Sequence, residues 1–113
     1  MKLSEIITKF DLEKLNKKPI NNETTISNGY IGDLLSQVLG AIKPNVSIWM
    51  TIQRHLNIIG VATMAGIPAI VICEGHDVPD DVIEKADTEN IVLLRSKDNA
   101  FQLAGKLYES GIR

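Results

Sequence analysis

Residues 46–73 read VSIWMTIQRHLNIIGVATMAGIPAIVIC, and they contain two apolar runs separated by a segment with helical spacing. The runs Val46–Ile52 and Pro68–Cys73 are short and nearly continuous, which is typical of strands covered on both faces. Between them, the apolar residues of Leu56–Ala65 recur at the spacing of a helix. A strand, a helix and a second strand in this order predict a parallel βαβ unit.

Further elements continue this alternation on both sides. Helices are expected at residues 3–10, 33–41, from about 78 onward and at 99–109, and strands within 20–28 and at 91–94. Leu12 and Leu15 extend the apolar spacing of the first helix, and Pro19 ends it because proline cannot continue a helix. Asp33 and Ser96 stand where they could cap the helices that follow them.

The alternation predicts an α/β fold of three layers, with a mostly parallel sheet and helices on both of its faces. No linker or low-complexity stretch interrupts residues 1–113, so a single domain is expected. Apolar residues make up 44% of the chain and charged residues 23%, which is ordinary for a globular domain.

Charge and composition exclude several classes of function. A net charge of −2 and an aromatic content of 4% disfavour binding to nucleic acid. No apolar run is long enough to span a membrane, and the N-terminus lacks the apolar core of a signal peptide. With a single cysteine, the chain cannot form an internal disulfide. We therefore expect a cytoplasmic protein without a membrane or nucleic-acid partner.

Polar residues gather in the loops that follow the expected strands. Ligands of parallel α/β sheets bind beyond the carboxyl ends of the strands, so these loops are the first place to look for a site. The loops cover residues 28–33, 53–57, 74–77 and 95–98. The candidate ligand-binding residues are Gly32, Asp33, Thr51, Arg54, His55 and Asn57, with Glu74 and His76 opposite them.

The densest polar cluster is the segment TIQRHLN, residues 51–57. Arg54 could clamp a phosphate or carboxylate with its paired donors, and His55 could act as an acid or base near neutral pH. Alternatively, His55 or Asn57 caps the next helix and Arg54 meets an acidic group of a partner. The segment NGYIGD, residues 28–33, could likewise hold an anion at a helix start, or form a tight turn with Asp33 as a cap.

Cys73 and His76 lie three residues apart after an expected strand, and a thiol beside an imidazole can become a nucleophile. Glu74 and Asp77 add negative charge there, which opposes formation of a thiolate. Two histidines and one cysteine, without the spacing of a zinc site, predict no metal, and one cysteine cannot hold an iron–sulfur cluster. No cofactor is expected.

Four stretches of the chain resemble the DRTGG domain family. Residues 29–36, GYIGDLLS, are similar to its glycine–aspartate–leucine opening, and residues 49–58, WMTIQRHLNI, resemble the Thr-Ile-Gln-x-His-x-Asn block of small stand-alone members. Residues 66–79 and 100–105 resemble the following strand and the closing helix. The resemblance covers residues 27–111. The chain departs from the naming residues, with Gln53-Arg54-His55 in place of an Asp-Arg pair and Cys73-Glu74-Gly75 in place of Thr-Gly-Gly.

The resemblance implies a three-layer α/β fold, similar also to the N-terminal domain of HPr kinase. DRTGG domains lie between CBS domains in regulated pyrophosphatases and ahead of phosphotransacetylase catalytic domains, where they resemble dimerising, nucleotide-responsive modules. Some stand-alone members are associated with hydrogenases.

We therefore expect a regulatory or interaction domain without catalytic residues. It would be a homodimer, supported by the apolar region around Trp49, that binds a small anionic ligand such as a nucleotide, or a larger enzyme, at the strand-end loops. Two alternatives remain at this stage. One is an accessory subunit of a hydrogenase or other redox complex, and the other is a small transferase that uses Cys73 with His76, or Asp33 with His55.

Overall fold

The sheet of this computed structural model, which describes residues 1–19, 23–41 and 46–113, has the strand order β1-β5-β4-β3-β2. β2, β3, β4 and β5 are parallel to one another, and β1 pairs with β5 in the antiparallel direction. The mostly parallel sheet predicted from the sequence is therefore confirmed. The strands are β1 (Glu13–Lys14), β2 (Gly29–Ile31), β3 (Ile48–Thr51), β4 (Ala69–Ile72) and β5 (Val92–Arg95).

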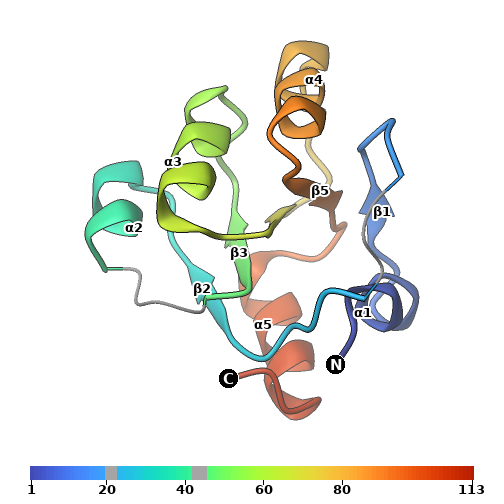
Figure 1. The fold of residues 1–113 in the computed structure, drawn as a ribbon. Helices are drawn as coiled ribbons and strands as arrows, with labels where there is room; N and C mark the ends of the chain where they lie inside the picture. Colours follow the sequence, from blue (N-terminus) through green and yellow to red (C-terminus); the bar gives the residue numbers. More distant parts are fainter. Residues whose placement is uncertain (20–22, 42–45) are drawn as a thin grey trace.

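Helices cover both faces of the sheet. Figure 1 shows α2, α3 and α4 along one face, and α1 and α5 on the other. This arrangement confirms the predicted three-layer α/β fold. No helix within the described ranges is long and apolar enough to cross a membrane. The helices are α1 (Leu3–Lys9), α2 (Leu35–Ala41), α3 (Asn57–Ala65), α4 (Asp80–Thr88) and α5 (Ala100–Glu109).

Each central strand sends alternate side chains into two separate cores, because successive residues of a strand point to opposite faces. Trp49 and Ile70 belong to the core beneath α2, α3 and α4, whereas Met50 and Val71 belong to the core beneath α1 and α5. Trp49 is fully buried, and its Nε1 donates a hydrogen bond of 2.8 Å to the carbonyl of Gly32. The expectation that the Trp49 region supports a dimer interface is therefore wrong, since this side chain is already inside the fold.

The first helix, predicted at residues 3–10, is confirmed to within one residue, but the apolar spacing of Leu12 and Leu15 does not extend it. It ends at Lys9, and Asp11 adopts a left-handed φ of 53° that turns the chain. Leu12 and Leu15 then belong to an extended segment instead of a longer helix, and the N–H of Leu15 donates to the carbonyl of Leu93. The prediction fails here because pairing with the edge of β5 outweighs the local helical pattern.

The strand predicted within residues 20–28 is displaced along the chain. Residues 20–22 lie outside the described residues, and Thr25 forms only an isolated bridge with Lys2. The edge strand of the sheet is instead Gly29–Ile31, in a stretch that the sequence analysis interpreted as loop. A Cβ on Gly29 would lie 3.3 Å from Ile48, so glycine suits this strand because it lets β2 and β3 pack closely.

Two predicted helix caps have other roles. The carboxylate of Asp33 accepts hydrogen bonds from Thr51 and Ile52 and none from the first turn of α2. Ser96 is buried, and its Oγ accepts from the N–H of Asp98, while the cap of α5 is Asn99. Both polar side chains were correctly expected near a helix start, but tertiary hydrogen bonds decide their partners.

Candidate functional site

The loops after β2, β3, β4 and β5 meet at the carboxyl edge of the sheet. The N–H of Cys73 donates to the carbonyl of Thr51 at 2.9 Å, which ties the end of β4 to the end of β3. The N–H of Gly75 donates to the carbonyl of Ser96 at 2.8 Å, which ties it to the end of β5. The convergence of strand-end loops, expected from a parallel sheet, is thus present in the fold.

Asp33 and Thr51 lie in direct contact at this edge. Thr51 Oγ1 donates to Asp33 Oδ1 at 2.8 Å, and the N–H of Ile52 donates to the same oxygen at 2.9 Å. Gln53 Nε2 donates to the carbonyl of Asp33 at 2.9 Å. These bonds position the loop after β3, so the polar atoms of Asp33 and Thr51 that they involve are already engaged within the protein.

Gly32 meets a packing requirement at the same edge. A Cβ at this position would lie 2.9 Å from the ring of Tyr30, closer than Cβ atoms approach other atoms, and 3.1 Å from Val38, which would have to shift. Its carbonyl accepts the indole hydrogen bond of Trp49. Gly32 therefore keeps the loop close to the sheet, and this role explains the residue without a ligand.

A pocket of about 330 Å³ lies beside the end of β3, and we call it the Arg54 pocket. Arg54 Nη1 donates to the carbonyl of Asp77 at 3.1 Å, which holds the guanidinium across the gap between two loops. Among the described residues, Arg54 forms no ion pair. Its remaining N–H groups can therefore bind an anion in the pocket. The lining residues are Ile52, Gln53, Arg54, His55, Asp77 and Pro79.

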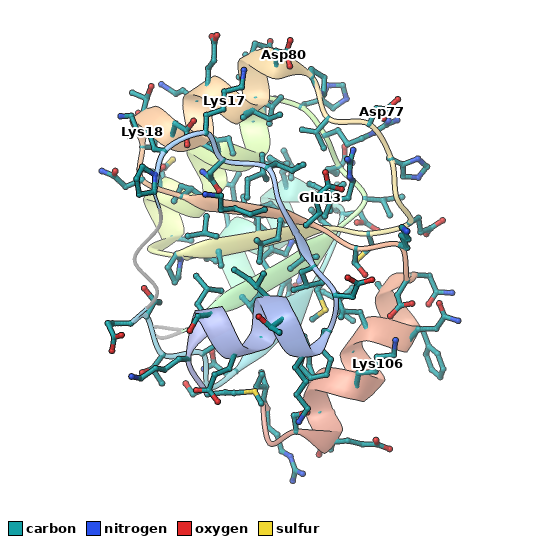
Figure 2. The ribbon with its side chains drawn as sticks, turned by 90° about the vertical axis from the view of Figure 1, so that its right-hand side faces the viewer. Glu13, Lys17, Lys18, Asp77, Asp80 and Lys106 are labelled. Carbon is teal, nitrogen blue, oxygen red and sulfur yellow. The ribbon has the colours of Figure 1, made fainter. Side chains whose placement is uncertain are left out.

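A second pocket, of about 450 Å³, lies beside the end of β5, and we call it the Arg95 pocket. Arg95 forms a two-pronged ion pair with Glu13, with Nη2 2.8 Å from Oε1 and 2.9 Å from Oε2. Arg95 Nη1 also donates to the carbonyl of His76 at 3.2 Å. Figure 2 shows Glu13 and Asp77, which both line this pocket. The carboxylates of Asp11, Glu13 and Asp77 outnumber the two cations of this lining, Arg95 and Lys97, so this pocket is the weaker candidate for an anion of the two.

Three further candidate residues lie at this edge and line neither the Arg54 pocket nor the Arg95 pocket, namely Asn57, Glu74 and His76. Asn57 is the first residue of α3, and that helix has no side-chain cap, so the alternative in which His55 or Asn57 caps it is wrong. The side chains of Asn57, Glu74 and His76 form no hydrogen bond with other described residues. His76 contributes its carbonyl, which accepts from Arg95.

The turn after β4 has an unusual backbone. Glu74 and Gly75 both adopt left-handed conformations, with φ values of 70° and 66°. Glycine adopts such conformations freely, whereas a residue with a Cβ does so at a cost in free energy. Glu74 is the position at which the resembling family carries a glycine, and the backbone here keeps a shape suited to glycine. The side chain of Glu74 is exposed and adds negative charge to the turn after β4.

Cys73 is fully buried at the end of β4. Burial, and then the negative charges of Asp33, Glu74 and Asp98, raise the pKa of its thiol from 9.0 to about 11. A thiol with such a pKa is almost entirely protonated at neutral pH, and the thiolate is the nucleophilic form. The geometry therefore argues against a transferase that attacks through Cys73.

Alkylation of Cys73 by iodoacetamide at pH 7.5 should be at least about 100-fold slower in the folded protein than in urea, because both burial and the raised pKa suppress the reactive thiolate. The reaction can be followed by mass spectrometry, and Cys73 is the single cysteine of the chain, so no other thiol interferes. A rate equal to that of the unfolded chain would show that the carboxyl edge opens, and would restore Cys73 as a candidate nucleophile.

Within the described ranges, no three His, Cys, Asp or Glu side chains are grouped in a way that could hold a metal ion. Arg95, Glu13, Lys106 and Asp98 form ion pairs around the edge, the last two at 2.6 Å. This edge therefore offers cationic and hydrogen-bonding groups. Arg54 lies beside one pocket and Lys97 beside the other, and neither forms an ion pair with a described residue.

Sequence reasoning missed several residues of the two pockets. Asp77 lines both pockets and holds Arg54 through its carbonyl, and Pro79 forms a wall. Asp11 and Glu13 come from the N-terminal segment, which reaches the edge only because β1 pairs with β5. The position of Asp77 five residues beyond the end of β4 was a usable signal, whereas nothing in the local sequence places Glu13 beside Arg95.

The fold is similar to a solved structure of the CBS and DRTGG domains of the regulatory region of Clostridium perfringens pyrophosphatase, complexed with the activator diadenosine tetraphosphate. The TM-score is 0.71 and the sequence identity 18%, and the likeness covers 91% of this chain and 44% of that one. The chain thus spans less than half the length of the regulatory region it matches. No family model matches the chain, and no curated protein sequence matches it. At this identity the likeness shows that the chain shares its fold with a part of that regulatory region.

Proposed function

We propose that this chain is a regulatory domain, without catalytic residues of its own, that binds a small anionic ligand at the carboxyl edge of its sheet. A nucleotide is the ligand that we favour. The domain would be a single DRTGG-like unit of residues 1–113 that acts in the cytoplasm, and it would work by transmitting ligand binding to a partner or to a second copy of itself.

One observation carries this proposal, namely the state of Arg54. Its guanidinium lies at the wall of a pocket, is oriented by the carbonyl of Asp77, and forms no ion pair with any described residue. Arginine presents a planar set of donors that matches the oxygens of phosphate and carboxylate groups. An oriented cation without a partner beside a hollow is what an anion site requires.

The walls of the Arg54 pocket fit the rest of a nucleotide. Ile52 and Pro79 supply apolar surface against which a flat base can pack, and His55 and Gln53 offer hydrogen bonds. Pockets for small ligands combine apolar walls with a few placed polar groups in this way. The likeness to a regulatory region solved with diadenosine tetraphosphate is consistent with a nucleotide ligand.

Other candidate residues have supporting parts in this proposal. Asp33 and Thr51 would hold the β3 loop in the shape that presents Arg54, and Gly32 would keep the neighbouring loop clear of it. Glu74 and His76 would face the ligand from the β4 loop, and Asn57 from the start of α3.

A thermal-shift titration with ATP, AMP, diadenosine tetraphosphate and inorganic phosphate tests the proposal. A ligand at 100 times its dissociation constant should add about 2.7 kcal/mol to the free energy of unfolding. For a domain of this size the melting temperature should rise by roughly 10 °C or more. In Arg54→Ala the rise should disappear at the same ligand concentration, because the truncation removes the anchoring cation.

Lys85→Ala is the matched control, since it also removes one positive charge but lies on α4 in an ion pair with Glu89. It should keep the full ligand-induced rise. If both variants lose the ligand-induced rise in melting temperature equally, ligand binding depends on the net charge of the protein and not on the Arg54 pocket. If no compound in the panel raises the melting temperature of the unaltered chain, the nucleotide proposal is wrong.

A second candidate function is the docking of a larger enzyme at the same edge. Leu34 is 68% exposed, and Ile52 and Leu56 are 41% and 44% exposed, although all three are large apolar residues in the strand-end loops. Exposed apolar side chains grouped in this way favour a protein partner. An association with a hydrogenase or another redox complex, as the resemblance implies, would be a case of such docking.

The transferase alternative finds less support. The Asp33 carboxylate is engaged by Thr51 and Ile52, so its pairing with His55 as a catalytic unit would break the hydrogen bonds that position the β3 loop. Capture of a partner by the unaltered chain, and its loss in Leu34→Asp, would separate the docking function from nucleotide binding, because Leu34 does not line the Arg54 pocket.

A further inference from the structure

The guanidinium of Arg54 has room for one anionic group. Its Nη1 donates to the carbonyl of Asp77 at 3.1 Å, while its Nε and Nη2 donate to none of the described residues. Two parallel N–H groups on one side of a guanidinium bind two oxygens of the same phosphate or carboxylate. The described lining of the Arg54 pocket contains no lysine and no second arginine. This pocket therefore offers one cationic anchor, which suits a single phosphate.

The backbone next to Arg54 has already used two of the donors that a second phosphate would need. The N–H of Ile52 donates to the carboxylate of Asp33 at 2.9 Å, and the N–H of Gln53 donates to Thr51 Oγ1 at 3.1 Å. Sites for polyphosphate chains present several free backbone N–H groups in a row, together with a lysine or a metal ion. The loop after β3 is built differently, because its first two N–H groups are bound within the protein.

Carboxylates flank the anchor on the side of α4. Asp77 lines the pocket, and Asp80 directly follows the wall residue Pro79, so the Cα atoms of Pro79 and Asp80 are about 3.8 Å apart. Figure 2 shows Asp77 and Asp80 along the segment that leads into α4. Charges act over about 10 Å at moderate salt, so both carboxylates act on a ligand in the pocket. Arg95 Nη1 lies 3.7 Å from Asp77 Oδ1, but the charge of Arg95 is already met by Glu13.

The positive end of the α4 dipole does not offset these carboxylates. A helix N-terminus is equivalent to about half an elementary charge and attracts anions. Helix α4 begins with Asp80 and Asp81, whose side chains are both exposed. Two carboxylates outweigh half a positive charge, so the start of α4 repels an extended chain of phosphates.

We propose that the Arg54 pocket selects a ligand with a single anionic group, namely a nucleoside monophosphate, and that Asp77 and Asp80 repel polyphosphate chains. This inference rests on the proposed function, since it presupposes that Arg54 binds a nucleotide. One terminal phosphate carries a charge of about −1.5 to −2 at neutral pH, and Arg54 offsets a large part of it. Each further phosphate adds negative charge that meets carboxylates. The preferred ligand of this chain is therefore not diadenosine tetraphosphate, the activator bound to the regulatory region of similar fold.

Isothermal titration calorimetry with AMP, ATP and diadenosine tetraphosphate tests the selection. EDTA is present, so that no divalent cation masks the charge of the phosphates. AMP should bind at least about tenfold more tightly than either of the other two compounds, because several like-charge interactions are avoided. If ATP or diadenosine tetraphosphate binds more tightly than AMP, the selection is overturned while the anion site at Arg54 stands. If none of the three compounds binds, the proposed function is wrong and the selection falls with it.

Two single substitutions test the cause of the selection. Asp77→Asn keeps the backbone carbonyl that holds Arg54 and removes only the charge, and Asp80→Asn does the same at the start of α4. Each should reduce the preference for AMP over ATP by at least about threefold. Glu109→Gln is the matched control, because it also removes one exposed carboxylate but lies at the end of α5 in the other layer, and it should keep the full preference. An unchanged preference in both Asp77→Asn and Asp80→Asn overturns the role of these carboxylates, since the shape of the pocket would then set the selection.

Discussion

Replacing Trp49 with alanine should lower the free energy of unfolding by about 3–5 kcal/mol, which is the range for removing a large aromatic side chain from a packed core. Trp49 is fully buried on β3, a central strand that pairs with β2 on one side and β4 on the other. Its ring packs in the core beneath α2, α3 and α4. The melting temperature should fall by roughly 15–25 °C.

The loss has two components. Truncation leaves a cavity that the surrounding isoleucines can fill only in part, and it removes the hydrogen bond from Trp49 Nε1 to the carbonyl of Gly32. That carbonyl lies in the loop that also carries Asp33, so the effect extends from the core to the carboxyl edge. We therefore expect Trp49→Ala to weaken ligand binding as well as stability, although the side chain lines neither edge pocket.

Trp49→Phe separates the two components. It keeps most of the apolar ring and removes the indole N–H, so it should cost about 1–2 kcal/mol. Urea unfolding followed by circular dichroism measures both variants, since Trp49 is the single tryptophan and its fluorescence is lost on substitution. If Trp49→Ala unfolds within 1 kcal/mol of the unaltered chain, on the order of an ordinary surface substitution, the packing described here is wrong.

The strands of the central βαβ unit were predictable because burial on both faces leaves a strong signal. The predicted strands Val46–Ile52 and Pro68–Cys73 contain the observed strands Ile48–Thr51 and Ala69–Ile72, and the predicted helix Leu56–Ala65 begins one residue early. Such strands must be apolar at every position, whatever lies around them. The sequence pattern and the tertiary structure therefore agree in this unit.

The two edge strands were not predictable for the opposite reason. β1 consists of Glu13 and Lys14, two charged residues whose side chains are exposed, and it exists because the chain returns to pair with β5. β2 begins with Gly29, which has no strand propensity, and it is held by pairing with β3. In both cases pairing with a strand distant in the sequence creates the strand, and the local sequence pattern does not predict that pairing.

The candidate site was predictable in its location and not in its details. A parallel sheet brings the strand-end loops together, so Arg54, His55 and Asp33 were correctly expected at one edge. Which of them remain available depends on hydrogen bonds that only the fold determines. The carboxylate of Asp33 is engaged by Thr51, and the guanidinium of Arg95 is engaged by Glu13. The guanidinium of Arg54 donates to the carbonyl of Asp77 and keeps further N–H groups beside a pocket.

Asn16→Ala should also destabilise the fold strongly, by about 2–4 kcal/mol, because it leaves buried polar groups without partners. Asn16 is buried and connects the N-terminal segment to the sheet and to α4. Its Nδ2 donates to the carbonyl of Ile91 at 2.9 Å and to Asp87 Oδ1 at 3.0 Å, and its Oδ1 accepts from the N–H of Leu93 at 2.7 Å. Figure 2 shows Lys17 and Lys18, the next residues, beside α4.

The hydrogen bonds between the N-terminal segment and α4 depend on the ionisation of Asp87. Burial alone would raise the pKa of Asp87, but hydrogen bonds from Asn16 and from the N–H groups of Lys17 and Lys18 outweigh it and hold the pKa below its ordinary value. A lowered folded-state pKa means that the contribution to stability is present above the unfolded-state pKa of about 3.9 and is lost as the pH falls through the folded-state value. The connection is therefore intact at pH 7.

Three variants measured by urea unfolding at pH 7 isolate the role of Asn16. Lys17→Ala removes an exposed neighbouring side chain and keeps every backbone bond, so it should change stability by less than about 0.5 kcal/mol. Asn16→Asp keeps an acceptor for Leu93 but loses both donors and sets a second carboxylate against Asp87, so it should be at least as destabilised as Asn16→Ala at pH 7. Lowering the pH to 4 should narrow the difference in free energy of unfolding between Asn16→Asp and Asn16→Ala, because a protonated carboxyl can donate to Asp87 again.

A decrease in the free energy of unfolding below 1 kcal/mol for Asn16→Ala, on the order of one ordinary hydrogen bond, would mean that water replaces the missing amide. The N-terminal segment would then not be anchored through Asn16.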